Sequence, residues 1–211
     1  MSDTAAKDAI LDAMLPHVPF DGWTMAAMRR AAHEAGIDET ELTHLFPAGP
    51  RDLVAWFSHW ADRAALIELD GQDLGAMKIP DRIAAGVRAR LGMLEPHREA
   101  VRRGMAFLAA PQHSLLALKL LYDTVDALWH AAGDTSTDFN FYTKRGLLAG
   151  VYAATTLYWL DDRSLGAADT HTFLDRRLAD VGKIPRAQTR VKEWARKLPD
   201  PFLLFRPVGR L

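Results

Sequence analysis

Residues 24–47 read TMAAMRRAAHEAGIDETELTHLFP, and this stretch decides the fold class. Its first half repeats alanine and methionine with the 3.6-residue period of an amphipathic helix, which we expect over 24–35. Gly36 breaks that helix, because glycine readily adopts the positive φ of a helix end. Asp38 can then cap a short second helix over 38–45. The stretch therefore predicts two helices joined by a tight glycine turn.

Helical periodicity continues along nearly the whole chain, with proline or glycine at the expected stops. No convincing run of alternating β-branched residues appears, so no strand is expected. We predict an all-α protein, a helical bundle of about ten helices. Beyond the two helices already described, they are expected at roughly 3–15, 50–69, 81–95, 97–109, 112–132, 138–161, 168–181 and 186–197.

Composition fits one globular domain that can bury a sizeable core, since 49% of the 211 residues are hydrophobic. The absence of cysteine excludes disulfides, thiolate metal sites and thiol catalysis. No apolar run reaches the ~18 residues of a membrane span. The net charge of −1 hides an asymmetry, because residues 183–211 hold eight basic and two acidic side chains. The chain is thus an acidic body with a basic tail.

The two-helix pattern and the number of helices after it resemble the helix-turn-helix and ligand-binding body of TetR-type regulators. Between residues 24 and 58, however, the sequence has only three basic side chains and five acidic ones. Such a surface cannot replace the counterions of phosphate, so we expect the architecture without nucleic-acid binding. The alternative is a TetR-type, ligand-responsive transcriptional regulator. The expected organisation is a helix-turn-helix-like element over 1–50, a helical body over 51–182 and a tail over 183–211.

Candidate chemistry in the body is sparse. Asp123, Asp126 and His130 share one helix face at i, i+3 and i+7, as an acid/base or metal site would need, but such a set is more often a solvated or subunit-facing polar stripe with one local hydrogen bond. A di-iron site requires paired Glu-x-x-His turns, and the chain has one, beginning at Glu41. We expect no catalytic residue, no metal and no cofactor.

The expected helix over 138–161 is apolar almost all round, which places it in the bundle core or across a dimer seam. Its side chains, with those of the preceding helices, form either plain core or the lining of a cavity for an apolar ligand. The candidate lining residues are Met105, Leu108, Leu116, Leu120, Trp129, Leu148, Tyr152 and Thr155.

The tail contains a basic amphipathic helix over 186–197, followed by an apolar cluster. Such a segment either lies in an anionic lipid surface or docks on its own domain with its cations solvated. The candidate membrane-binding residues are Arg190, Lys192, Trp194, Arg196, Lys197 and Phe202.

Residues 125–152, VDALWHAAGDTSTDFNFYTKRGLLAGVY, join two long helices. Gly133 can end the first, and the hydroxyls and carboxylate of residues 136–138 can cap the second. This capping leaves Phe139, Phe141 and Tyr142 unexplained, because a first helical turn rarely buries aromatics on more than one side. One aromatic face is therefore expected to be exposed or to meet another chain.

The same stretch closely resembles the signature of the lipid-binding accessory protein family of ubiquinone biosynthesis, with Phe141 where the family often has Trp. Weaker resemblance covers most of the chain up to about residue 182. It implies a TetR-like fold used without DNA, an interior pocket for an isoprenoid quinone precursor or phospholipid, and dimerisation through the last helices of the body. It also implies a C-terminal amphipathic helix that engages the membrane surface.

Family members also present a patch to the di-iron demethoxyubiquinone hydroxylase or other ubiquinone-biosynthesis enzymes. Carried over by motif position, that patch would contain Asp126, Leu128, Phe141, Tyr142 and Arg145. The resemblance thus implies a non-catalytic lipid-binding protein that presents its ligand to the hydroxylase. Without a transit-like segment at its start, the chain looks like a bacterial member, expected in the cytoplasm against the inner membrane.

Overall fold

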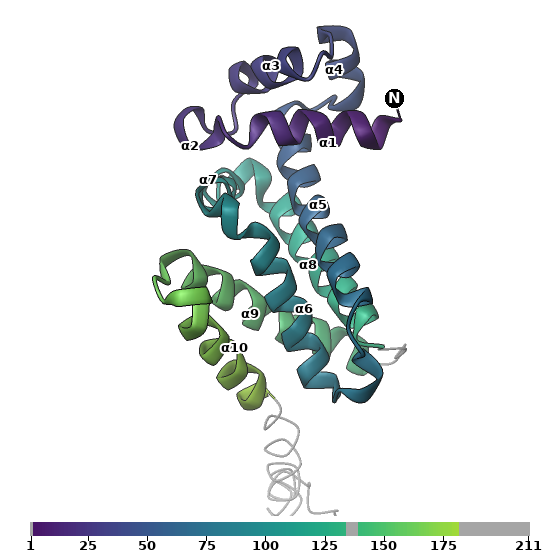
Figure 1. The fold of residues 1–211 in the computed structure, drawn as a ribbon, viewed down its shortest axis with the longest axis vertical. Coiled ribbons are helices and arrows are strands. Elements are labelled where there is room, and N and C mark those ends of the chain that lie inside the picture. The colour runs from purple at the N-terminus through teal and green to yellow at the C-terminus, as the bar shows by residue number, and fades with distance from the viewer. Residues whose placement is uncertain (1, 134–138, 182–211) are drawn as a thin grey trace, which may run out of the picture.

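A computed structural model describes residues 2–133 and 139–181, and side chains within these ranges except at 139–143. All regular structure in the described ranges is helical, which confirms the all-α prediction (Figure 1). The helices are α1 (Asp3–Met14), α2 (Val18–Asp21), α3 (Met25–Glu34), α4 (Glu39–Leu45), α5 (Pro50–Asp70), α6 (Ile79–Leu94), α7 (Arg98–Leu108), α8 (Ser114–Ala131), α9 (Phe139–Asp161) and α10 (Ala168–Val181). The expected helix over 186–197 lies outside the described residues.

The short helix α2 was not expected, because its prolines resemble stops. Pro19 occupies the first turn of α2. There a missing backbone N–H costs nothing, since no helical acceptor is available for it. The structure also contains short 3-10 turns at Leu74–Ala76, Glu95–His97, Pro111–His113 and Leu165–Ala167. These turns lie at or between the ends of the predicted helices.

The helix-turn-helix element forms as its capping residues predict. Thr24 caps α3 by accepting a hydrogen bond from the Ala27 N–H at 3.3 Å, and Asp38 caps α4 by accepting one from Glu41 at 2.8 Å. Gly36 between the two helices has φ 72°, the left-handed conformation that favours glycine. Helices α1 to α4 gather at one end of α5 (Figure 1), and α1 packs against α3.

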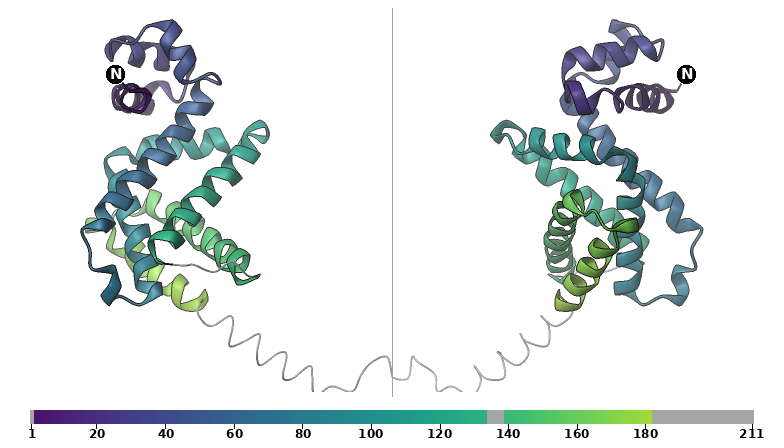
Figure 2. Two further views of the ribbon diagram at one scale, coloured as in Figure 1. Left: turned by 90° about the vertical axis from the view of Figure 1, so that its right-hand side faces the viewer. Right: turned by 60° about the vertical axis from the view of Figure 1, so that its left-hand side comes forward.

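The body is built around α5, α6 and α8, which pack against one another, while α9 packs on α8 and α10 packs on α9 and α6 (Figure 2). Gly86 on α6 allows this close approach, because a Cβ there would lie 2.7 Å from Leu128 Cδ2 on α8. Trp159 of α9 is fully buried, and its indole N–H donates to Glu95 at 2.8 Å. The body therefore has a continuous core that extends from α5 to α10.

Helix α8 ends as predicted at Gly133, which has φ 83°. Arg82 of α6 reaches this end and donates to the Ala132 carbonyl at 3.1 Å. The predicted cap of the next helix, residues 136–138, lies outside the described part of the chain. Within the described ranges, no helix combines the length and the apolar character needed to cross a bilayer.

Candidate functional site

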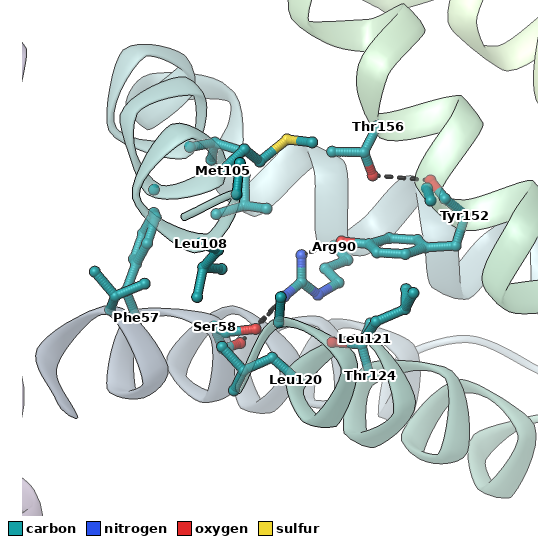
Figure 3. A pocket seen from close by; sticks show the side chains of 17 residues that line it. Phe57, Ser58, Arg90, Met105, Leu108, Leu120, Leu121, Thr124, Tyr152 and Thr156 are labelled. Atoms are coloured by element: carbon teal, nitrogen blue, oxygen red, sulfur yellow. Dashed lines mark hydrogen bonds between the residues drawn. The ribbon is translucent and has the colours of Figure 1, made fainter. Parts of the chain in front are cut away.

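A cavity of about 320 Å³ lies inside the body, between α5, α6, α7, α8 and α9 (Figure 3). This volume falls at the lower end of the ~300–1,000 Å³ typical of small-molecule sites. The walls are mostly apolar, and they are formed by Val54, Phe57, Leu94, Val101, Gly104, Met105, Leu108, Ala109, Ala117, Leu120, Leu121 and Ala153. The polar groups that line it are Ser58, Arg90, Thr124, Tyr152 and Thr156.

The cavity has an open side and a closed end. Met105 and Leu108 on α7 are half-buried, and Ala109, just after α7, is exposed. At the other end, Arg90 of α6 and Tyr152 of α9 are both buried. The lining is therefore more exposed along α7, and Arg90 and Tyr152 form its closed end.

Arg90 organises the closed end. Only 5% of the residue is exposed. Its Nε donates to Asp62 Oδ1 at 2.6 Å, and its terminal nitrogens donate to the Tyr152 hydroxyl and to the Ser58 Oγ, the latter at 3.0 Å. Thr124 of α8 donates to Asp62 at 3.0 Å. Figure 3 shows the guanidinium between Ser58 and Tyr152, so residues from four helices meet in one polar network.

The protonation states at this end follow from burial and charge. Burial raises the pKa of Tyr152, and the opposing effect of Arg90 does not cancel this, so the phenol keeps its proton at neutral pH. Burial alone would lower the pKa of Arg90, but Tyr152 and Asp62 raise it above its ordinary value. The network thus combines a charged pair, Arg90 and Asp62, with a neutral phenol.

Four of the eight predicted lining residues face the cavity, namely Met105, Leu108, Leu120 and Tyr152. The other four lie outside its lining. Leu148 is in the core, and Thr155 is fully buried, with its hydroxyl donating to the Val151 carbonyl at 2.7 Å. Trp129 lies half-buried beneath the Lys144 ammonium, and Leu116 is half-buried on α8. Because α9 is apolar all round, its sequence does not indicate which face meets a cavity and which meets other helices.

Sequence reasoning missed the polar network, although α6 carried a signal for it. Ile83, Val87, Arg90 and Leu94 recur at spacings of 4, 3 and 4, which places them on one helix face. Three of them are aliphatic core residues, so Arg90 is a cation at a core position. A buried arginine requires a partner, and the structure supplies it from Asp62 on the neighbouring helix α5.

The predicted partner patch divides between interior and surface. Leu128 and Arg145 are 4% and 3% exposed, whereas the Asp126 side chain is 33% exposed and accepts a hydrogen bond from Arg145 at 2.6 Å. In this arrangement Leu128 and Arg145 are buried, and the Asp126 side chain beside them is partly exposed. The side chains of Phe141 and Tyr142 lie outside the described part of the structure.

Charged contacts surround the polar stripe of Asp123, Asp126 and His130, both within α8 and with residues of α5 and α9. Asp123 pairs with Lys119 one turn away, and His130 Nδ1 lies 3.7 Å from Asp126. Over 2–133 and 139–181, no group of three or more histidine or acidic side chains could hold a metal ion. The predicted membrane-binding residues, at 190–202, lie outside the described residues.

Comparison with known proteins places this architecture in a family. The COQ9 family model matches residues 115–185, which begin at the second residue of α8 and include α9 and α10. The protein named "Ubiquinone biosynthesis protein COQ9, mitochondrial" of Drosophila melanogaster is 38% identical over 182 residues, 84% of this chain and 55% of that protein. This chain belongs to the COQ9 family. The relatives of the same name from Rattus norvegicus and Homo sapiens are 33% and 31% identical over 90% of this chain, covering 63% and 62% of their own length.

The chain therefore spans a little over half of the length of these COQ9 relatives. Its fold is also that of a solved structure, a TetR transcriptional regulator from Nitrosomonas europaea, with a TM-score of 0.67. That likeness covers 82% of this chain and 95% of the regulator at 20% identity. It confirms the predicted TetR-like fold, and at this identity it concerns the fold alone.

Proposed function

We propose that this protein takes part in ubiquinone biosynthesis as a non-catalytic lipid-binding protein. It would bind a polyprenylated quinone precursor or another lipid at the membrane and present it to a demethoxyubiquinone hydroxylase. The observation that carries the proposal is the apolar cavity between α5 and α9, in a chain whose relatives are named for ubiquinone biosynthesis.

The cavity supplies the driving force for binding. Each methylene that leaves water for an apolar wall gains roughly 0.8 kcal/mol. The same methylene is already sheltered in a bilayer, so exchange between membrane and cavity is close to balanced. A near-balanced exchange suits a carrier, because the ligand can be both taken up and released.

Delivery would use the surface around the end of α8 and the start of α9. Asp126 is the accessible member of the patch among the residues with described side chains, and Phe141 and Tyr142 would complete it. The basic tail would hold the protein peripherally on an anionic membrane surface. A homodimer through α9 and α10 is supported by Leu157 and Tyr158, apolar side chains that α9 leaves exposed.

Lipid binding is tested by purifying the protein and identifying co-extracted lipids by mass spectrometry. A matched pair of variants locates the lipid: Ala117→Phe fills the cavity lining, whereas Ala106→Phe adds the same ring at an exposed position on α7. We expect the first variant to lose bound lipid and the second to retain it. Absence of lipid in the unmodified protein, together with no binding of added quinone precursors, would refute the proposal.

Partner recognition is tested separately. Phe141→Glu or Tyr142→Glu should weaken binding to the hydroxylase and leave lipid content and thermal unfolding unchanged. Phe20→Glu, at an exposed aromatic on α2, is the control that should change none of these. Unfolding of the first two variants would instead place those aromatics in the core.

The alternative function, DNA binding by the helix-turn-helix element, finds little support in its surface charges. Arg29 pairs with Glu39 at 2.7 Å, and Arg30 pairs with Asp21 at 2.8 Å. Two of the cations that would contact phosphate are therefore engaged within the protein. Salt-dependent binding to genomic DNA fragments would favour the regulator instead.

A further inference from the structure

A groove of about 910 Å³ follows α6 between the end of α5 and the start of α10, apart from the apolar cavity. The face of α6 that lines it carries Ala85, Ala89 and Gly92, so this wall has no long side chains. Grooves with an apolar floor are a common binding site for an amphipathic helix, which lays its own apolar face into them. The floor of this groove leaves room for the side chains of such a helix.

The charges along the groove are mainly acidic. Glu68 and Asp81 line it and are exposed, and in the part of the chain that the structure describes neither forms an ion pair. A third carboxylate of the lining, Glu95, is engaged by Arg98 at 2.9 Å. Arg88 also lines the groove, but it donates to a carboxylate of α10 at 2.6 Å, so its charge is balanced. The groove therefore favours a cationic helix over a neutral or anionic one.

The chain itself contains a cationic amphipathic segment of matching length, residues 186–198. It holds five basic side chains and one acidic one. Val191, Trp194 and Leu198 recur at spacings of 3 and 4, so they share one face when the segment is helical. Thirteen helical residues extend about 20 Å, and the groove follows α6 for roughly the same distance, from Asp81 to Glu95.

The course of α10 brings this segment to the groove. Beyond the end of α6, Arg98 donates to the Asp162 carbonyl, shortly before α10 begins. Nearer the start of α6, Arg88 donates to Asp175 in the middle of α10. Helix α10 thus runs antiparallel to α6 and ends at the end of the body where α6 begins (Figure 1). Residues 182–185 then lead to the segment, and a connection of this length is sufficient for a helix to turn back along its predecessor.

We propose that residues 186–198 dock as a helix in the groove of the same chain, with their apolar face on α6 and their cations beside Glu68 and Asp81. The same apolar face and cations would contact an anionic membrane, so docking and membrane binding exclude one another. The docked segment keeps the protein off the membrane until an anionic surface competes for it. This effect rests on the membrane contact in the proposed function, whereas the docking itself does not.

Double electron–electron resonance between two spin labels tests the docking in the full chain. Because the chain has no cysteine, Leu165→Cys and Glu193→Cys place the two labels uniquely. Leu165 is 97% exposed and lies between two residues that line the groove. Position 193 points away from the apolar face of the helical segment. A docked segment gives a narrow distribution of distances between the labels in the absence of membranes, and a broad distribution would overturn the proposal.

Charge reversal tests whether the groove holds the segment. Glu68→Lys with Asp81→Lys should broaden the distribution, because both exposed carboxylates then repel the cations. Arg190→Glu with Arg196→Glu in the same protein should restore a narrow distribution, which unfolding of the groove would not allow. A distribution that stays narrow after the first pair of changes would overturn the proposal.

A control pair and a dilution complete the distance measurement. Asp3→Lys with Glu41→Lys makes the same change of net charge at exposed positions of α1 and α4 and should leave the distribution narrow. An excess of unlabelled protein should also leave it narrow, because both labels are on one chain. Loss of the narrow distribution on dilution would mean that the segment docks on a second copy, which would overturn docking within the same chain.

Vesicle binding measures the effect on membrane contact. Vesicles of phosphatidylcholine with phosphatidylglycerol should broaden the distribution as the segment leaves the groove, and vesicles of phosphatidylcholine alone should not. The Glu68→Lys, Asp81→Lys variant should bind the anionic vesicles about 5-fold more tightly than the control pair, the combined value of two exposed ion pairs. Bound protein with a distribution that is still narrow would overturn the exclusion. Absence of vesicle binding in all variants, with a narrow distribution, would support docking and contradict the membrane contact in the proposed function.

Discussion

Arg145 of α9 donates from Nε to Asp126 Oδ1 of α8 at 2.6 Å, and only 3% of the arginine is exposed. The pair joins the two helices at the end of the body where the partner surface is expected. Because the arginine is buried, the interaction is little screened by solvent. We therefore expect it to fix the relative position of α8 and α9 at this corner.

A double-mutant cycle measures that contribution. Asp126→Asn, Arg145→Met and the double variant should give a coupling energy of about 1–3 kcal/mol in urea unfolding. The cycle isolates the pair from the other contacts of Arg145. The control cycle uses Lys119→Met and Asp123→Asn, an exposed i, i+4 pair on α8 for which about 0.3–0.5 kcal/mol is expected. Equal coupling in both cycles would contradict the structural role of Arg145.

Two glycines on α6 should respond in opposite ways to alanine. At Gly92 no atom lies within 4 Å of an added Cβ, so Gly92→Ala should stabilise the protein by about 0.5–1 kcal/mol through helix propensity. At Gly86 the Cβ would lie 2.7 Å from Leu128 Cδ2, and that leucine is buried. Gly86→Ala should therefore destabilise by about 1–3 kcal/mol in thermal unfolding. Stabilisation by both changes would show that α6 and α8 have room to separate.

The sequence predicts best the structural elements that depend on residues close together in the chain. Gly36 and Asp38 define the turn and cap of the helix-turn-helix within a few residues, and the structure shows both. The boundaries of the other predicted helices within residues 2–133 and 139–181 agree to within two residues, because periodicity and proline are also local signals.

The cavity was harder to predict because it depends on five helices that meet in space. Met105 and Leu108 line the cavity, whereas Leu148 lies in the core, although all three are apolar residues on helices. Periodicity identifies the buried face of a helix, but it does not distinguish a face that packs against another helix from one that lines a cavity. The network of Arg90 and Asp62 joins α6 to α5 across 28 residues of sequence, a pairing that only the fold reveals.

Asp162 links the end of α9 to α10 and should make the protein sensitive to strong acid. It accepts hydrogen bonds from the Thr170 N–H and hydroxyl at 2.9 and 2.6 Å, and from the Ser164 N–H at 2.8 Å. Burial by itself would raise the pKa of Asp162, but these hydrogen bonds from Thr170 and Ser164 lower it well below the usual range. A lowered folded-state pKa means that the carboxylate stabilises the fold above about pH 3.9 and loses that contribution as the pH falls further.

Asp162→Asn should accordingly lower the free energy of unfolding by about 1–2 kcal/mol at neutral pH. The gap between the variant and the unmodified protein should narrow below about pH 3.9, where the unfolded carboxyl is protonated. Urea unfolding across this range measures both effects. Asp161→Asn, at the adjacent position, is the control. The Asp161 side chain is 81% exposed, so it should contribute little to the free energy of unfolding. A gap that stays constant with pH would mean that Asp162 acts through shape and not through charge.

His97 should give a second pH dependence, in a milder range. Its ring lies edge-on to Phe57 and Trp60, with centroids 6.4 and 5.8 Å away. Burial lowers the pKa of His97, and the nearby charge of Asp12 only partly opposes this. Because the unfolded histidine takes up a proton first, stability is complete above about pH 6.5 and declines as the pH falls toward the folded-state pKa.

His97→Phe keeps an aromatic ring at this position and removes the titrating group. The free energy of unfolding of the unmodified protein should therefore fall more between about pH 7.5 and about pH 5 than that of the variant. His44→Phe, at an exposed histidine of α4, should retain the full decline. Parallel pH profiles for the unmodified protein and His97→Phe would show that the aromatic surroundings of His97 tolerate its charge.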